Sequence, residues 1–226
     1  MSSSRWQAQG NVYLVVEEPL DPRLVRERVG DADGILEVRG HGRDWVEVAI
    51  WNPDGSRAEM SGNGTRIAAR WLAERTGAEI VTVRVGEREV QARLLGGPFV
   101  EQELRYRVGA PGTAAGVRFT PVDVGNPHAV VDGDPAELPR LGPLLERHPR
   151  FPGRTNVQVA RRIGDRAIEA RVWERGVGET GSSGTSAVAV AAAFGAADVT
   201  VRFPGGDLHV RLEGDRAYLT GPAEEA

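Results

Sequence analysis

Apolar and polar residues alternate over one short segment in each half of the chain. The alternation covers residues 46–50 in the first half and residues 168–172 in the second. Alternation with a period of two is typical of a strand that buries one face. Each segment leads into a glycine-rich stretch and then into an alanine-rich segment, residues 65–75 and 186–194. The pattern therefore predicts a strand, a loop and a helix in that order, once in each half.

The two predicted helices differ in polarity. The first is amphipathic. Its inward apolar face is formed by Ile67, Trp71 and Leu72, and its outward polar face by Arg66, Arg70 and Glu74. The second, residues 186–194, is apolar all round. A helix with one apolar face covers a core from one side, whereas a helix without a polar face is buried on every side. We therefore expect the second helix to lie in the centre of its half.

Behind each of these helices the pattern predicts a β-hairpin. The hairpins pair residues 81–85 with 90–94 and residues 199–203 with 208–212. Each of them turns at a short segment that contains glycine, as hairpins commonly do. A further helix is predicted from Pro139 to Glu146, and residues 218–222 are predicted to form a closing strand.

The two halves repeat the same motifs in the same order. Trp51 and Ser61 correspond to Trp173 and Ser183, in both cases at a separation of 122 residues. Further matches precede and follow this pair, at separations of 115 and 118 residues. Three ordered matches predict an α+β protein of two homologous lobes, each of them mostly β with one central helix.

The boundary between the lobes is predicted in residues 109–116, a stretch of glycine, alanine, proline and threonine without periodicity. The N-terminal lobe then comprises residues 1–112, and the C-terminal lobe residues 113–215. A closing strand within residues 216–226 is expected to return to the first lobe. Lobes of this size can each bury a core.

Composition and charge narrow the class of protein. Of the 226 residues, 40% are hydrophobic and 27% are charged, as in a globular protein. The net charge of −4 argues against a nucleic-acid partner, because nucleic-acid-binding surfaces are basic. The lack of cysteine excludes disulfides and thiolate metal sites, and the four histidines are too scattered for a metal site. Since we find no secretory signal and no apolar run that spans a bilayer, we expect a cytoplasmic protein without a membrane partner.

The repeated loop and helix start predict a particular chemistry. Backbone N–H groups at a helix N-terminus are unpaired, and the helix dipole adds positive potential there, so such a start binds anions. Two starts that face each other would hold a carboxylate from both sides. Ser61 and Ser183 would then flank the bound group. That arrangement suits removal of a proton from one face of a carbon and delivery of a proton to the other face.

The motifs resemble those of the diaminopimelate epimerase family. The most specific segment is Trp173 to Thr180, followed by Ser183-Gly184-Thr185. The other matching segments run in family order along nearly the whole chain: Gly10-Asn11, Asp33-Gly34, residues 52–56, residues 59–64, residues 125–128, Asn156 and residues 220–222. The resemblance implies a cofactor-independent isomerase of lysine biosynthesis, which interconverts LL- and meso-diaminopimelate. It also implies that a barrel-like, mainly antiparallel sheet wraps the helix of each lobe, in a family that often forms homodimers.

The resemblance implies a role for each matching position. The two catalytic bases of the family fall on Ser61 and Ser183. Glu174 is expected to hold an ammonium group, Arg175 to pair with the distal carboxylate, and His128 to lie near the first base. The remaining contacts to the substrate are the backbone amides of Gly62, Asn63, Gly184 and Thr185, which bind the reacting carboxylate, and the side chains of Asn11, Asn52, Asn126 and Asn156. Neither a metal nor pyridoxal phosphate is implied.

Both base positions depart from the family, which has cysteine where this chain has serine. The pKa of a Cys thiol is near 8.5, whereas a Ser hydroxyl is closer to water, with a pKa of about 15.7. A gap of about 7 pKa units corresponds to about 10 kcal/mol in the population of the base form. A helix dipole contributes at most about 2 kcal/mol. We therefore expect weak or absent epimerase activity, whether the serines are native or replace cysteines in a laboratory variant.

Other functions fit parts of the pattern. A non-catalytic homologue would bind diaminopimelate without exchanging its α-proton. A sister isomerase of the same architecture would act on proline or another small amino acid, although Arg175 favours a substrate with a second carboxylate. A serine hydrolase is disfavoured, because neither Ser61 nor Ser183 has glycine two residues away on both sides. A single Ser-Gly turn is also a common N-cap, but the duplicated spacing favours a functional role.

Overall fold

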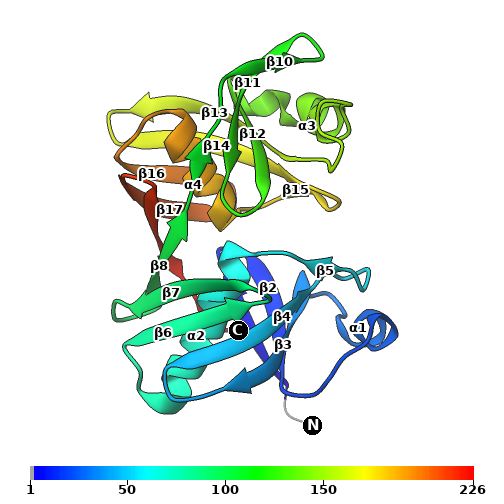
Figure 1. Ribbon diagram of the computed structural model, residues 1–226, viewed down its shortest axis with the longest axis vertical. Helices are drawn as coiled ribbons and strands as arrows, with labels where there is room; N and C mark the ends of the chain where they lie inside the picture. The colour runs from blue at the N-terminus through cyan, green and yellow to red at the C-terminus, as the bar shows by residue number, and fades with distance from the viewer. Residues whose placement is uncertain (1–2) are drawn as a thin grey trace. The chain divides into compact units, whose positions relative to one another are not determined.

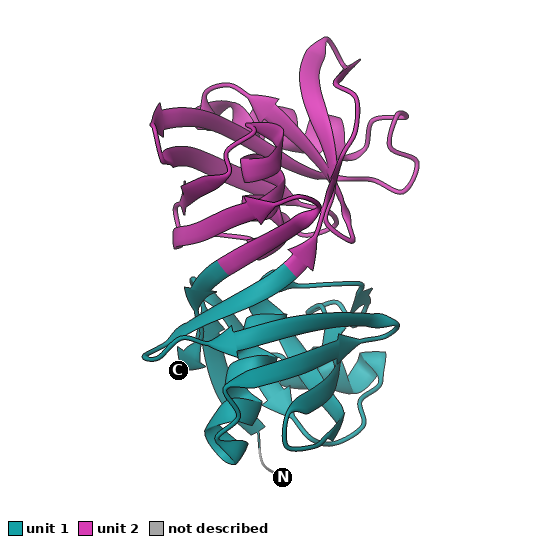
Figure 2. Cartoon of the chain, turned by 60° about the vertical axis from the view of Figure 1, so that its left-hand side comes forward, with its two compact units in different colours: residues 1–103, 220–226 teal, residues 104–219 magenta. Residues whose placement is uncertain are grey.

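The computed structural model describes residues 3–226, which form two compact units (Figure 2). Unit 1 comprises the chain up to Glu103 together with Thr220–Ala226, and unit 2 comprises Leu104–Leu219. The chain therefore passes from one unit to the other at two places. The last residues return to the first unit, where their backbone pairs with the first strand.

The first passage between the units lies earlier than the stretch 109–116 in which we placed the lobe boundary. This stretch has no periodicity, but it contains a short strand, Gly112–Ala114 (β10), which pairs with Val117–Asp123 (β11). Arg107–Val108 (β9) pairs with β11 as well. These pairings attach the stretch to unit 2. That each lobe is an independent domain stays a prediction.

Unit 1 is a sheet that surrounds one helix. Its elements are β1 (Ser3–Ala8), β2 (Asn11–Val16), α1 (Pro22–Arg28), β3 (Gly34–His41), β4 (Trp45–Trp51), β5 (Arg57–Ala58), α2 (Gly62–Thr76), β6 (Ile80–Val85), β7 (Arg88–Leu94) and β19 (Glu224–Glu225). The pairs β2–β3 and β4–β6 are parallel, and β1–β2, β3–β4 and β6–β7 are antiparallel. Helix α2 contacts β1 to β4, β6 and β7, so the strands enclose it (Figure 1).

Unit 2 repeats this arrangement around a second helix. Besides β9 to β11, its elements are β12 (Pro127–Asp132), a 3-10 helix (Pro135–Glu137), α3 (Leu138–Glu146), β13 (Asn156–Gly164), β14 (Ala167–Glu174), β15 (Gly178–Thr180), α4 (Gly184–Ala193), β16 (Asp198–Phe203) and β17 (Gly206–Glu213). Two strands, β8 (Phe99–Arg105) and β18 (Arg216–Pro222), contribute residues to both units. Helix α4 contacts β11 to β14, β16 and β17.

Most strand pairings of the two units correspond, although the pair β10–β11 of unit 2 has no counterpart among the described residues of unit 1. The parallel pairs β12–β13 and β14–β16 match β2–β3 and β4–β6. The antiparallel pair β13–β14 has a register shift between Arg162 and Gly164, and β3–β4 has one between Val38 and Gly40. The predicted fold class is confirmed: this is an α+β protein of two homologous lobes, each with a mainly antiparallel sheet around a central helix.

The burial of α2 follows the prediction at the apolar positions and departs from it at Arg66. Ile67, Trp71 and Leu72 are buried, and Glu74 is exposed, as expected. Arg66, which we expected to point outward, is 0% exposed. The prediction was wrong because a helix enclosed by strands buries nearly its whole first half, so a polar residue there has no solvent face. Helix α4, apolar all round, is buried from Gly184 to Ala192 as predicted.

The predicted hairpins, the helix from residue 139 to 146 and the closing strand are all present, as β6–β7, β16–β17, α3 and β18. Helix α1 was not predicted. Its N-terminus has two common features of a helix start. Asp21 accepts hydrogen bonds from the N–H groups of Arg23 and Leu24, and Pro22 occupies the first turn. In the described part of the chain, no helix combines the length and the apolar character needed to cross a membrane.

Candidate active site

Ser61 caps the N-terminus of α2 with its side chain. Its Oγ accepts a hydrogen bond from the Gly64 N–H at 3.0 Å, and its carbonyl accepts the first helical bond, from the Thr65 N–H, at 2.9 Å. The N–H groups of Gly62 and Asn63 precede this bond and point out of the helix start. A Cβ at position 64 would lie 3.3 Å from Ser61 Oγ. Glycine therefore allows the close turn that presents these N–H groups, as the sequence predicts for an anion site.

Tyr13 from β2 makes a second contact to Ser61. The two hydroxyl groups share a hydrogen bond at 3.1 Å. Tyr13 pairs in register with Gly34 of β3, where a Cβ would lie 2.7 Å from the tyrosine ring and 2.6 Å from the Trp51 carbonyl oxygen. The missing side chain at position 34 thus makes room for the ring that reaches Ser61. Tyr13 was not predicted as a site residue, because its position opposite a glycine is visible only in the sheet register.

A chain of polar contacts connects Asn11 to the inside of α2. The Asn63 side-chain amide donates to Asn11 Oδ1, and Asn63 Oδ1 accepts a hydrogen bond of 2.5 Å from Arg66 Nη2. The side-chain carbonyl of Asn11 therefore accepts a hydrogen bond from the protein. Its side-chain amide group has no partner among the described residues. An amide group in this state can donate to a carboxylate.

Asn52 follows β4 and belongs to a tight turn. Its backbone N–H donates to the Ser56 carbonyl at 2.9 Å, and its side-chain amide donates to Ser56 Oγ at 2.9 Å. The turn is stabilised further by Asp54, whose carboxylate accepts from the Ser56 N–H at 2.8 Å and whose pKa is lowered by these bonds to Ser56. The half-buried Asn52 side chain is thus held in place at the end of its strand.

Ser183 occupies the same position in unit 2, at the N-cap of α4, but it is held differently. Its carbonyl accepts from the Ala187 N–H at 3.0 Å, whereas its hydroxyl caps no N–H group of the described chain. The side chain is nearly buried, at 6% exposure for the residue. The N–H groups of Gly184 and Thr185 precede the first helical bond, as do their counterparts in unit 1.

His128 is a buried, neutral ring that orients Asn126. Its Nδ1 faces the side-chain amide of Gln158 at 2.9 Å, and its Nε2 faces Asn126 Oδ1 at 2.8 Å. Because the Gln158 amide donates to Nδ1, the ring proton resides on Nε2 and is donated to Asn126. Burial and, to a smaller extent, the charge of Arg175 lower the pKa of His128 to about 3. The ring is therefore uncharged at neutral pH, and its placement near the first base stays a prediction.

The side chain of Asn156 is also oriented by hydrogen bonds to the protein. Its side-chain carbonyl accepts from the Arg175 backbone N–H at 2.9 Å, and one amide hydrogen goes to the Pro127 carbonyl at 2.9 Å. The Arg175 guanidinium donates to the Gly153 carbonyl at 3.2 Å. The neighbouring Glu174 accepts from Thr180 Oγ1 at 2.6 Å. Unit 2 thus brings Asn126, His128, Asn156 and Arg175 into one polar network. In it, Asn126 also reaches Thr185 Oγ1 at 3.4 Å.

A cavity of about 500 Å³ opens beside this network in unit 2. Its polar lining residues are Arg107, Asp123, Asn126, His128 and Thr155. The cavity is large enough for a small polar ligand. It places solvent-accessible space next to two of the residues that the sequence singled out.

Each lobe also contains a tryptophan that is hydrogen-bonded to a buried glutamate, a pair that was not predicted. Trp51 Nε1 donates to Glu37 at 2.7 Å, and Trp173 Nε1 donates to Glu146 at 3.0 Å. Both glutamates are buried. The tryptophans are equivalent residues of the repeat, but their partners come from other segments, so the spacing signals only one member of each pair. These pairs fix the strand that leads into each Ser-Gly loop.

Comparison with known proteins identifies the family. The family model for diaminopimelate epimerase matches residues 120–225. A diaminopimelate epimerase of Pelotomaculum thermopropionicum is 37% identical over 227 aligned positions, which cover 86% of this chain and 81% of the relative. That of Desulforudis audaxviator is 35% identical over 269 positions, covering 100% of this chain and 97% of the relative. This chain belongs to the diaminopimelate epimerase family. The predicted family and the predicted class of enzyme, an isomerase, are confirmed.

Solved structures show how widely the fold of this epimerase family is shared. A hydroxyproline epimerase of Agrobacterium vitis matches with a TM-score of 0.74 at 18% identity, over 99% of this chain and 88% of that one. A phenazine biosynthesis protein of the PhzF family from Bacillus anthracis matches with a TM-score of 0.74 at 11% identity, over 99% and 96%. At such low identities the likeness concerns the fold alone.

Proposed function

We propose that this chain binds diaminopimelate and that its serines make it a slow epimerase. In this proposal, Ser61 and Ser183 stand at the two base positions and act without a cofactor. The substrate is a small amino acid with two carboxylates and two amines. The proposed setting is lysine biosynthesis in the cytoplasm. Homodimer formation stays a prediction.

The observation that carries the proposal is the orientation of three asparagine side chains. In Asn11, Asn126 and Asn156, the side-chain carbonyl oxygen already accepts a hydrogen bond from the protein. One amide hydrogen of Asn126 goes to Thr185 Oγ1 and one of Asn156 goes to the Pro127 carbonyl. The second amide hydrogen of each, and the amide group of Asn11, remain for a ligand. Three amide donors of this kind, together with free N–H groups at helix starts, fit a ligand rich in acceptor oxygens. Carboxylates meet this requirement.

The proposed roles are those that the family resemblance implies. The N–H groups of Gly62 and Asn63, and those of Gly184 and Thr185, bind the reacting carboxylate. Arg175, whose backbone is held by Asn156, pairs with the distal carboxylate, and its guanidinium provides the fork that a carboxylate prefers. Glu174 and Asn52 contact the ammonium groups and the carboxylate of the substrate.

Proton transfer is the step that the serines slow down. An alkoxide at position 61 would be stabilised by the Gly64 N–H and the Tyr13 hydroxyl, each already within 3.1 Å of Ser61 Oγ. Hydrogen bonds to a charged group contribute about 1.5–3 kcal/mol each. Together they offset only part of the deficit of about 10 kcal/mol relative to a thiolate. Position 183 has no such capping bond within the described chain, so its deficit is larger.

The test is to install cysteine at both positions and to follow the α-proton. In deuterated water, the Ser61→Cys/Ser183→Cys variant should exchange the α-proton of LL- and meso-diaminopimelate and interconvert the two isomers. The unchanged chain should bind both isomers in a calorimetric titration but exchange at least about a thousandfold more slowly, since a thiolate is far more populated than an alkoxide.

The outcomes separate the possible functions. If the cysteine variant binds diaminopimelate but exchanges no proton, the chain is a non-catalytic binding homologue. If it binds neither isomer but binds proline or hydroxyproline, the chain is a sister isomerase with another substrate. Exchange by the unchanged chain at the rate of the cysteine variant would contradict the chemical argument about the serines.

A further inference from the structure

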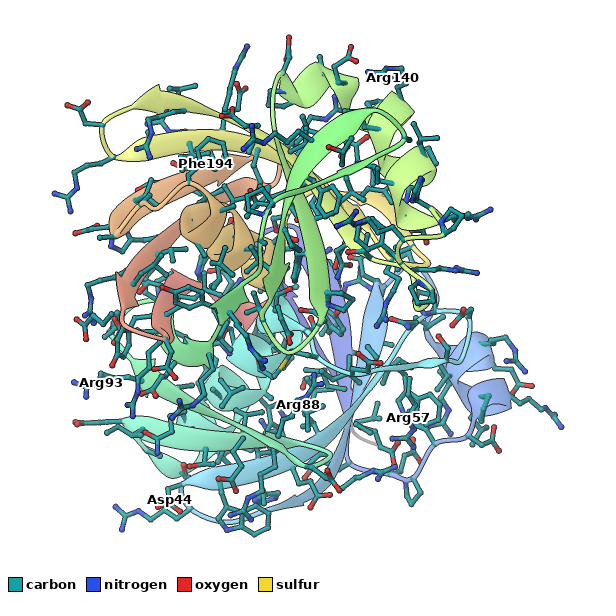
Figure 3. All side chains as sticks on the ribbon, turned by 45° about the horizontal axis from the view of Figure 1, so that its top comes forward. Asp44, Arg57, Arg88, Arg93, Arg140 and Phe194 are labelled. Carbon is teal, nitrogen blue, oxygen red and sulfur yellow. The ribbon has the colours of Figure 1, made fainter. Side chains whose placement is uncertain are left out.

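Arg66 differs from most arginines of the chain. Arginines such as Arg93 and Arg140 are exposed, and Figure 3 shows their side chains directed away from the ribbon. Arg66 lies in the second turn of α2 and is 0% exposed. It donates to Asn63 Oδ1 at 2.5 Å and to the Pro222 carbonyl at 3.4 Å. Its Nη1 has no hydrogen-bond partner among residues 3–226.

The charge of this side chain is not neutralised within unit 1. Burial lowers the pKa of the Arg66 guanidinium to about 9, so the group is still protonated at neutral pH. No carboxylate of the described chain lies within ion-pair distance of it. A buried cation without an anionic partner destabilises a fold, and apolar residues of similar volume often stabilise it instead. The stability of the lobe therefore gives no reason for arginine at this position.

Arg66 is connected through hydrogen bonds to the N-terminus of α2. Asn63 accepts from Arg66 with its carbonyl and donates to Asn11 with its amide, so Arg66 determines which way the Asn63 side chain is turned. That orientation in turn leaves the Asn11 amide for a ligand. Asn63 also supplies one of the N–H groups that precede the first helical bond. The guanidinium, three residues further along the helix, adds a positive charge behind these donors.

We propose that Arg66 is a positioning residue of this site, and that the carboxylate of the bound amino acid supplies the counter-charge it lacks. This inference rests on the proposed function, because it takes the helix start at Ser61 as the place where the reacting carboxylate binds. Arg66 acts through Asn63 and through its charge, without touching the substrate. In a poorly solvated interior, the charge of Arg66 attracts the carboxylate of the bound amino acid more strongly than it would in water.

The experiment compares Arg66→Met with Arg70→Met in the chain as it stands. Methionine keeps much of the volume and removes the charge and the bond to Asn63. Arg70 lies one turn later on the same helix, pairs with Glu74 and is partly exposed, which makes it a matched control. Binding of meso-diaminopimelate is measured by calorimetric titration, and stability by urea denaturation. We expect Arg66→Met to weaken binding by about tenfold or more at equal or higher stability, and Arg70→Met to leave binding unchanged.

A third variant separates charge from packing. Arg66→Lys keeps the charge without the planar fork, so its affinity should lie between those of the unchanged chain and Arg66→Met. If Arg66→Met does not fold, Arg66→Lys and Arg66→Gln give the same comparison. The inference is overturned if the uncharged variant binds within about twofold of the unchanged chain. It is also overturned if binding and stability fall together and lysine restores neither. If the unchanged chain itself does not bind diaminopimelate, the proposed function fails instead.

Discussion

Ser61 and Ser183 occupy equivalent positions, but their side chains make different contacts. Ser61 Oγ accepts from Gly64 and shares a hydrogen bond with Tyr13, whereas the Ser183 hydroxyl caps no N–H group of the part of the chain described here. The repeat spacing predicted both residues as first members of the loops. It could not predict their hydrogen bonds, because these depend on side-chain rotamers and on a tyrosine from a distant strand.

Alanine substitutions at the two serines should lower the free energy of unfolding by different amounts. Ser61→Ala removes the cap of α2 and should lower the free energy of unfolding by about 1 kcal/mol. Ser183→Ala removes no capping bond and should change it by about 0.5 kcal/mol or less. Urea denaturation of both variants at neutral pH measures the difference. Equal losses would show that the hydrogen bond to Gly64 does not stabilise the helix.

His128 should make stability sensitive to mild acid. Its pKa is about 3 in the folded chain and about 6.5 for an ordinary histidine, so the unfolded chain takes up a proton that the folded chain excludes. The contribution is fully present above pH 6.5 and is lost as the pH falls towards 3. Relative to His128→Gln, the unchanged chain should lose about 1.4 kcal/mol per pH unit between pH 6 and 4. A constant difference between the two proteins in urea denaturation over this range would contradict the burial of a neutral ring.

Most elements were predictable from periodicity. The strands before the Ser-Gly loops, both hairpins and the two central helices lie where the apolar pattern places them. Arg66 was not predictable in this way, because a helix with arginine and glutamate on one side looks amphipathic even when strands enclose it. The orientation of the asparagine amides was not predictable from the sequence either, since it is set by partners such as Arg66 and His128.

The close packing of β2, β3 and β4 at Gly34 is testable at the scale of these elements. Gly34→Ala should lower the free energy of unfolding by about 1–3 kcal/mol, because the new Cβ overlaps the Trp51 carbonyl and the Tyr13 ring. Gly153→Ala is the control, since a Cβ there meets no atom of the described chain within 4 Å. It should be neutral or slightly stabilising, by up to about 1 kcal/mol. A loss at position 153 as large as that at position 34 would show that steric overlap is not the cause.

At the scale of the whole molecule, the duplicated pattern was the strongest signal in the sequence. It predicted two lobes of the same construction, and most strand pairings of one unit have a counterpart in the other. The precise passage between the units was not predictable, because it lies between Glu103 and Leu104, inside strand β8, and no break in the sequence pattern marks it. The functional meaning of the duplication, one base from each lobe, is a proposal about chemistry.

Single cysteine variants test this central claim most directly. If each lobe supplies the base for one face of the α-carbon, Ser61→Cys alone should exchange the α-proton of only one isomer of diaminopimelate in deuterated water. Ser183→Cys alone should exchange only the other isomer, and neither variant should interconvert the two. If both variants exchange the same isomer, or if either exchanges both, the two serines do not serve opposite faces of one stereocentre.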